Sequence, residues 1–303
     1  MRIATSQFQG TMTRGLEFNQ TNISRLDEQM ASGNKILLPS DDPVTNVRLS
    51  RLTREEAIVS QYRDNIGAIK IRLAKNETYL TSMTNDITQV HDLMVWASDG
   101  SNSGADLGSM VNSLTALRDS LFYGANERDP EGRYLFSGTL TNTPAITYDN
   151  TQAIGARYSF TGNTNQQRVT VGNGITQAAN VDVSGLENLL NQLDTTINEL
   201  QQPGVSATTP TLVTALAANM TGADDALALI SGKIADFGGV QNILTTLDGN
   251  HANVSLSNQT AMTDLGQLDY GLAATELNGY NLALQSSYKA YAKISELSLF
   301  SVL

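Results

Sequence analysis

Few residues of this 303-residue chain have the types and spacing that catalysis requires. The sequence has no cysteine, which removes thiol chemistry, thiolate zinc sites and iron–sulfur clusters. His91 and His251 each stand alone in a helical pattern, where a histidine is more often a solvated or capped side chain than a general base. Asp41 and Asp42 could be a metal or acid pair, but adjacent carboxylates before Pro43 are better explained as a helix N-cap and a partner of the helix dipole.

An acidic loop is the remaining candidate for ion binding. Glu127, Asp129 and Glu131 could bind calcium there, but their spacing is not that of an EF-hand and is typical of a solvated turn. Gly172-Asn173-Gly174 follows a strand pattern without opening a helix, so it predicts a turn and not a phosphate-binding loop. We therefore expect no catalytic residue, no cofactor and no metal.

Composition and charge narrow the classes of partner. The net charge of −11 argues against nucleic acid and anionic membrane, since both require basic patches, and no apolar run approaches transmembrane length. A hydrophobic content of 40% with only 6% aromatic residues suits helical rods. Residues 1–7 lack the charged and apolar regions of a cleavable signal peptide, which leaves cytoplasmic residence or export by a route that reads no Sec-type signal.

The longest regular pattern is a heptad seam, from Leu52 to Ala97. Its steps alternate between three and four residues, and all members except Glu55 and Asn76 are apolar or aromatic. Asn76 either sets the register or is a tolerated exposed residue. The seam consists of Leu52, Glu55, Val59, Tyr62, Ile66, Ile69, Leu73, Asn76, Leu80, Met83, Ile87, Val90, Met94 and Ala97.

This seam predicts one continuous helix of roughly 80 Å, at 1.5 Å per residue. Asp42 is a good N-cap, Pro43 takes the first helical position, and the first strong turn after them is Ser98-Asp99-Gly100. So long a helix needs other helices along its length.

Four further segments have helical spacing: 1–32, 107–121, 186–200 and 211–260. The first has only a thin apolar stripe, and the second is long enough to run antiparallel to the end of the long helix. Residues 146–183 change to a period of two, with turns at Gly162-Asn163 and Gly172-Asn173-Gly174, which predicts a small β insertion.

A second heptad closes the chain. Tyr270, Leu277, Leu284 and Tyr291 are spaced by seven, and the simplest partner for this helix is the N-terminal one. We therefore predict a mainly α fold: a long helical coiled-coil rod with paired N- and C-terminal helices and a small β-rich insertion domain at the tip.

This layout predicts three domains. Residues 1–42 and 262–303 form a terminal coiled-coil assembly domain, residues 43–132 and 186–261 a helical rod domain, and residues 133–185 a small β insertion domain. Each terminal seam is too thin to be well buried within one molecule, so it becomes an interface when neighbouring subunits supply the remaining faces. The predicted interface residues are Phe8, Met12, Ile23, Leu26, Met30, Tyr270, Leu277, Tyr280, Leu284, Tyr291, Ile294, Leu297, Leu299 and Phe300.

Particular motifs resemble the flagellin family. They are residues 26–33 (LDEQMASG) followed by 39–43 (PSDDP), residues 132–138 (GRYLFSG), and residues 283–290 (ALQSSYKA) with 297–300 (LSLF). Together they look most like the family member at the junction of hook and filament. Filament flagellins share the Ser-Gly and Asp-Asp elements but usually lack Pro43 and the Gly-Arg-Tyr piece.

The resemblance implies a secreted, extracellular structural subunit of the bacterial flagellum. It implies export of the unfolded chain by the flagellar type III apparatus with an export chaperone, and assembly with copies of itself as a ring between the first hook-associated protein and flagellin. The alternative is a filament flagellin subunit. A third hypothesis is an enzyme or sugar-binding module in the β insertion, although that insertion lacks a polar cluster converging with an aromatic platform.

Overall fold

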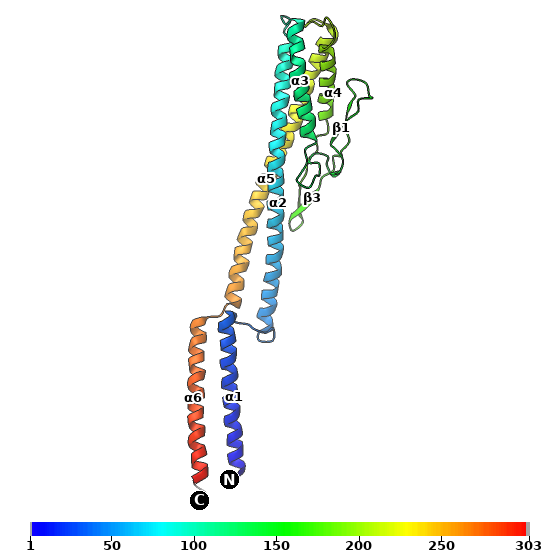
Figure 1. Cartoon of the computed structure of the whole chain (residues 1–303). Helices are drawn as coiled ribbons and strands as arrows, with labels where there is room; N and C mark the ends of the chain where they lie inside the picture. The colour runs from blue at the N-terminus through cyan, green and yellow to red at the C-terminus, as the bar shows by residue number, and fades with distance from the viewer. Residues whose placement is uncertain (1, 301–303) are drawn as a thin grey trace. The chain divides into compact units, whose positions relative to one another are not determined.

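A computed structural model describes the backbone of residues 2–300 and the side chains of residues 7–293. Over that range the chain forms six helices and two two-stranded antiparallel sheets, which confirms the predicted mainly α fold with a small β region (Figure 1). The chain divides into two compact units, Met1–Ser60 with Ala252–Leu303, and Gln61–His251. The division into three domains with the boundaries given above stays a prediction.

Helix α2 (Pro43–Ala97) is 55 residues long and confirms the predicted continuous helix. Asp42 caps it, because its carboxylate accepts hydrogen bonds from the backbone N–H (3.0 Å) and the hydroxyl (2.6 Å) of Thr45. From Val59 to Ala97 every position of the predicted seam is buried except the half-buried Tyr62. The apolar face of α2 is therefore covered over most of its length.

The two polar residues of the predicted seam, Glu55 and Asn76, differ in burial. Glu55 is exposed, and the half-buried Glu56 occupies the seam because its carboxylate accepts hydrogen bonds from Ser255 and from Gln259 (3.3 Å). Asn76 is buried, so the interpretation of it as an exposed residue is wrong. Its side chain lines a polar cavity of about 60 Å³ with Arg72 among other residues. Of the two interpretations of Asn76, only the one in which it sets the helix register is compatible with its burial.

Helix α5 (Pro210–Gly266) runs antiparallel to α2. Polar contacts within the unit Gln61–His251 fix this direction: Arg63 with Asp248 (3.0 Å), Lys70 with Thr245 (3.1 Å) and Glu77 with Gln241 (2.9 Å). Partner numbers fall on α5 as they rise on α2, as antiparallel helices require. The helix is continuous through its glycines and extends beyond its predicted end at 260.

Two shorter helices complete a bundle in the same unit. Helix α3 (Gly104–Ala125) runs antiparallel to α2 as predicted, and the Ser120 hydroxyl donates to the Asp86 carboxylate at 2.7 Å. Helix α4 (Leu186–Leu200) packs on α3 and also contacts α5, where Asn219 donates to the Thr196 hydroxyl at 2.6 Å. The buried apolar residues of α2, α3, α4 and α5 form one continuous core.

The β segment consists of two hairpins. Strand β1 (Ile146–Tyr148) pairs with β2 (Tyr158–Phe160), and β3 (Arg168–Gly172) pairs with β4 (Ile175–Ala178). The predicted turn after β3 is confirmed, since Asn173 and Gly174 join the strands of the second hairpin. Gly162 lies in a bend between the two sheets and does not form a hairpin turn.

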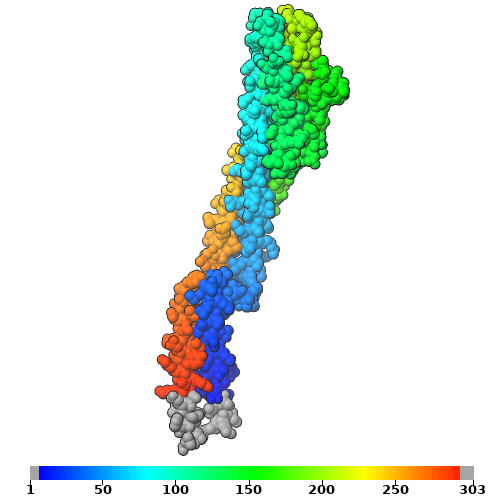
Figure 2. Space-filling model, viewed as in Figure 1, coloured from blue at the N-terminus to red at the C-terminus, as the bar shows by residue number. Residues whose placement is uncertain are grey.

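The prediction that this segment lies at the tip of the rod is wrong. Asn65 of α2 donates to the Thr170 carbonyl (2.8 Å), and Arg72 of α2 donates to Gln167 (3.2 Å), so the second hairpin lies along the side of the helices. Figure 2 shows the green surface of the β segment against the cyan surface of α2. The end of the bundle is formed instead by the turns around Gly104 and Val205, where a Cβ on Gly104 would lie 2.7 Å from the Val205 carbonyl oxygen. Period-two sequence patterns carry no information on which end of a helix a hairpin contacts.

Gly138 shows why the segment before the strands is fixed. Its φ of +70° favours glycine, and a Cβ there would lie 1.9 Å from the Asn163 carbonyl oxygen. Gly132 has a similar φ of +81°, but nothing lies within 4 Å of its Cβ position. A side chain at either glycine would therefore strain the backbone, but only a side chain at position 138 would also overlap a neighbouring atom.

We expect Gly138→Ala to destabilise the chain by about 2 kcal/mol more than Gly132→Ala, because only the first adds overlap to the left-handed strain. The measurement is urea unfolding of the full chain followed by far-ultraviolet circular dichroism. Equal midpoints for the two variants would contradict the close approach of Gly138 and Asn163.

Candidate functional site

The terminal helices form the candidate site. Helix α1 (Arg2–Ser32) and helix α6 (Tyr270–Phe300) lie side by side, which confirms their predicted pairing (Figure 1). Backbone hydrogen bonds join the segments at one end of the pair, from Lys35 N–H to the Gly266 carbonyl (2.8 Å) and from Leu268 N–H to the Gly33 carbonyl (2.9 Å). The helix pair is thus closed within the subunit at this end.

Local signals in the sequence place these ends. Gly33 terminates α1 with a φ of +73°, a conformation in which glycine has no steric cost. Asp269 caps α6, because its carboxylate accepts hydrogen bonds from the N–H groups of Gly271 (2.9 Å) and Leu272 (3.1 Å). The Tyr270 hydroxyl then donates to the Met30 carbonyl at 3.1 Å.

The acid pair before α2 has a structural role. Asp41 accepts hydrogen bonds from the N–H groups of Leu37 (3.2 Å) and Leu38 (2.9 Å). Hydrogen bonds from the Thr45 side chain and backbone hold the pKa of Asp42 below its usual value of 3.8. Both carboxylates therefore organise the chain that links α1 to α2.

The predicted interface residues fall into groups of different burial. Leu26 is buried in the subunit, with 2% of its surface exposed. Half-buried are Met12, Ile23, Met30, Leu277, Tyr280 and Leu284. Largely exposed are Phe8, Tyr270 and Tyr291. The side chains of Ile294, Leu297, Leu299 and Phe300 lie outside the described residues. That these positions form an assembly interface stays a prediction.

Heptad analysis missed other apolar side chains on the same helices. Phe18, Leu272, Leu282 and Tyr288 are all exposed, and Leu282 keeps 66% of its surface in solvent. None of them occupies a seam position of the pattern read from the sequence. A helical-wheel comparison would have found Leu272 and Leu282, because both are apolar residues far from the buried direction of α6.

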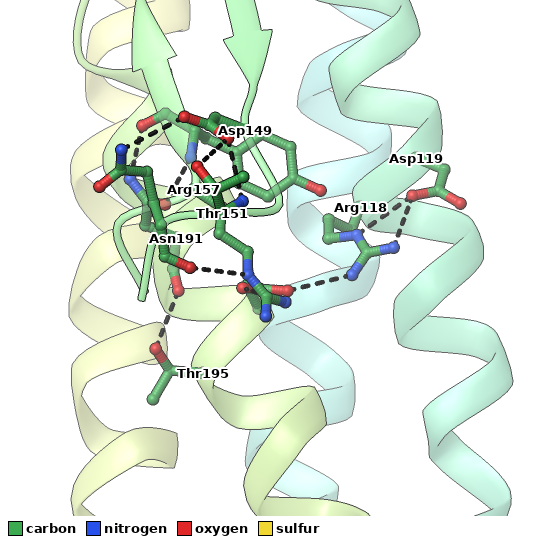
Figure 3. A network of polar contacts seen from close by, with 10 residues as sticks. Arg118, Asp119, Asp149, Thr151, Arg157, Asn191 and Thr195 are labelled. Carbon is green, nitrogen blue, oxygen red and sulfur yellow. Dashed lines mark hydrogen bonds and ion pairs between the residues drawn. The ribbon is translucent and has the colours of Figure 1, made fainter. Parts of the chain in front are cut away.

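Figure 3 shows a network of polar contacts in the unit Gln61–His251. The Asp194 carboxylate, 5% exposed, pairs with Arg118 (3.4 Å) and Arg157 (3.5 Å). Burial raises the pKa of the nearby Tyr158 hydroxyl to about 12. Asn191 fixes the same strand by exchanging hydrogen bonds with the Tyr158 backbone (2.9 and 2.8 Å). Because Arg118 and Arg157 both pair with Asp194, this network joins α3 and α4 to the residue directly before β2.

His251 and Asp129, two further candidates from the sequence, are also engaged in the fold. His251 Nε2 lies 2.8 Å from the Val171 carbonyl oxygen, and its ring packs against Tyr62. Asp129 binds the Arg133 guanidinium at 2.9 Å and accepts its backbone N–H at 2.8 Å. Among residues whose placement is described, no group of three or more His, Asp or Glu side chains could hold a metal. Likewise, none of the described helices has the length and apolarity needed to cross a membrane.

Comparisons with known proteins agree with this architecture. A family model described as the bacterial flagellin N-terminal helical region matches residues 3–141. Flagellar hook-associated protein 3 of Escherichia coli strain K12 is 28% identical over the whole of this chain and 99% of its own length.

Solved structures extend the comparison. A Vibrio parahaemolyticus protein described as flagellar hook-associated is 31% identical, with a TM-score of 0.68 over 75% of this chain and 100% of that one. The flagellar hook-associated protein-3 of Legionella pneumophila shares the fold, with a TM-score of 0.63 over 71% of this chain and 98% of its own, at 14% identity.

The chain therefore belongs to the flagellin family, a family of structural proteins of the bacterial flagellum. Within that family, its similarity over the full length is to hook-associated protein 3.

The lowered pKa of Asp42 gives a pH-dependent prediction. A depressed pKa contributes stability that is present above 3.8 and is lost as pH falls through the lower, folded value. Asp42→Asn keeps an N-capping oxygen but does not titrate. We expect the Thr45 amide of the native chain to lose hydrogen-exchange protection below pH 3.8, and that of Asp42→Asn to lose less. The same loss in both chains would contradict the role of the Asp42 charge.

Leu26 tests the helix pair within the subunit. Leu26→Asp would bury an unpaired carboxylate between α1 and α6, at a cost of about 3 kcal/mol. We expect faster hydrogen exchange in both helices and unchanged protection in Gln61–His251. Leu282→Asp is the matched control, because that side chain is exposed and its exchange should equal that of the native chain. Native protection in Leu26→Asp would show that the pair does not depend on this contact.

Proposed function

We propose that this chain is a structural subunit that joins the flagellar hook to the filament. It would assemble with copies of itself as a ring, between the first hook-associated protein and flagellin. The proposal assigns no catalytic role. It is supported by the similarity to hook-associated protein 3 over the full length of the chain.

The single observation that carries the proposal is the incomplete burial of the terminal helix pair. Leu26 and Ala273 are the buried apolar side chains among the described residues of α1 and α6. Phe8, Phe18, Leu272, Leu282 and Tyr288 all remain exposed. A pair of 31-residue helices with so small a core has apolar surface available for neighbouring subunits.

The same feature suits assembly outside the cell. Ordering a residue costs on the order of 1 to 2 kcal/mol in backbone entropy, so a thin stripe offsets this cost only when neighbours add contacts. The terminal helices would therefore become fully stable in the assembled ring. We infer that the unfolded chain is exported by the flagellar type III apparatus and that an export chaperone covers these helices beforehand.

We expect cells that lack this chain to make hooks without filaments and to release monomeric flagellin into the medium. Expression of the native chain from a plasmid should restore filaments, as seen by electron microscopy. Attached filaments in the deletion strain would overturn the proposal.

A second measurement separates a junction subunit from a filament flagellin. Purified protein is added to filament fragments, and their lengths are measured. A junction subunit should leave the fragments at their starting length, whereas flagellin, as a positive control, elongates them. Elongation by this chain would assign it to the filament.

A further inference from the structure

Helix α2 carries a second heptad stripe on a face about 100° round the helix from its seam, because each of Arg51, Arg54 and Ile58 directly precedes a seam position. Val44, Val47, Arg51, Arg54 and Ile58 follow steps of three, four, three and four residues, so they share one face of the helix. All five side chains are exposed, with values of 64% for Val44, 58% for Val47 and 46% for Ile58. The stripe spans about 21 Å of helix at 1.5 Å per residue. This is the pattern of a helix face that a partner covers.

The two arginines of this stripe define the charge of the partner. Neither Arg51 nor Arg54 makes an ion pair or a side-chain hydrogen bond with any residue that the structure describes. The chain has fewer basic residues (19) than acidic ones (30), and its net charge is −11. A partner of this face should therefore offer carboxylates beside apolar side chains.

A groove in the same unit has that chemistry. It has a volume of about 500 Å³, and its apolar wall includes Leu26, Ile36 and Leu272. Its carboxylates are Asp41, Asp42, Asp264, Asp269 and Glu276, and its cations are Arg25 and Lys35.

The carboxylates of the groove are not equivalent. Asp41, Asp42 and Asp269 accept backbone hydrogen bonds at chain turns and helix starts. Asp264 and Glu276 are exposed and make no side-chain hydrogen bond within the described part of the chain. These two carboxylates are the ones available to arginines of a partner.

We propose that the stripe Val44–Ile58 of one subunit docks into this groove of a second copy. This inference rests on the proposed function, since it describes how copies meet in the ring. The stripe and the groove are different surfaces of one chain, so the contact is heterologous and repeats from copy to copy. Apolar contacts of Val44, Val47 and Ile58 would add area, and the pairing of Arg51 and Arg54 with Asp264 and Glu276 would fix the orientation.

Cross-linking tests the contact directly, because the chain has no cysteine of its own. Arg54→Cys and Glu276→Cys are combined in one chain, and flagella from cells that make only this variant are treated with a short bismaleimide. A heterologous contact should give a ladder of dimers, trimers and larger products on a denaturing gel. Either single variant should give none of the larger products.

Charge reversal provides an independent test. We expect Arg51→Glu to reduce the amount of the chain retained on isolated hooks by at least about tenfold, since like charges would then face each other. Arg48→Glu is the control for the change of charge, because Arg48 is exposed on the same helix without being one of the five stripe residues, and its loss of retention should be much smaller. Adding Asp264→Arg to Arg51→Glu should restore retention, because Arg54 is the residue placed opposite Glu276.

Immunogold labelling keeps this inference separate from the proposed function. If the double-cysteine chain is found at the hook end without a ladder, and Arg51→Glu is retained like Arg48→Glu, the docking is overturned while the junction role stands. If the native chain is absent from the hook end, the proposed function fails and the docking fails with it.

Discussion

The apolar seam of α2 must be covered along its length, because an isolated helix of this kind is marginal in water. Different elements cover it in turn within the unit Gln61–His251. Helix α5 runs antiparallel along it, α3 packs on its last turns, and the second hairpin with the residue before it contacts an earlier stretch at Asn65 and Arg72. Each of these elements lies where it covers a stretch of the apolar seam that would otherwise be exposed to water. The buried Asn76 belongs to the same seam, and its side-chain oxygen has no hydrogen-bond partner among the described residues.

Polar contacts then determine how the helices are aligned, which the burial of apolar side chains alone does not. The ion pairs of Asp194 hold together α3, α4 and the residue directly before β2. The polar contacts cited between α2 and α5 are one ion pair and two hydrogen bonds spaced along the helices, and they set the antiparallel alignment. Hydrophobic contact is not directional, so such pairs contribute more to register than to net stability. The terminal helices have fewer of both kinds of contact, which is why their surfaces remain open to other molecules.

Periodicity and capping signals were sufficient to predict the helices. The Asp42-Pro43 start of α2 and the pairing of α1 with α6 follow from local chemistry and from the need to cover two thin stripes. The side of the bundle that the hairpins contact could not be predicted, because the hydrogen bond from Asn65 to Thr170 joins residues whose types give no sign of each other. The groove beside Glu276 was missed for a related reason. It is formed by the end of α1, the start of α6 and the segments that follow α1 and precede α6, and no repeat in the sequence marks such a meeting of segments.

The pairing of segments that lie progressively further apart in the sequence also sets an order of folding. The Ser120 and Asp86 side chains are separated by 34 residues, Lys70 and Thr245 by 175, and Tyr270 and Met30 by 240. Closing a loop of 240 residues from the open chain is slow, because its ends must be brought together before any contact rewards them. Once the inner contacts have formed, however, each outer contact closes only a short additional loop. Contacts near the middle of the sequence therefore form first during folding. The contacts between the two terminal helices form last, and they are the first to break on unfolding.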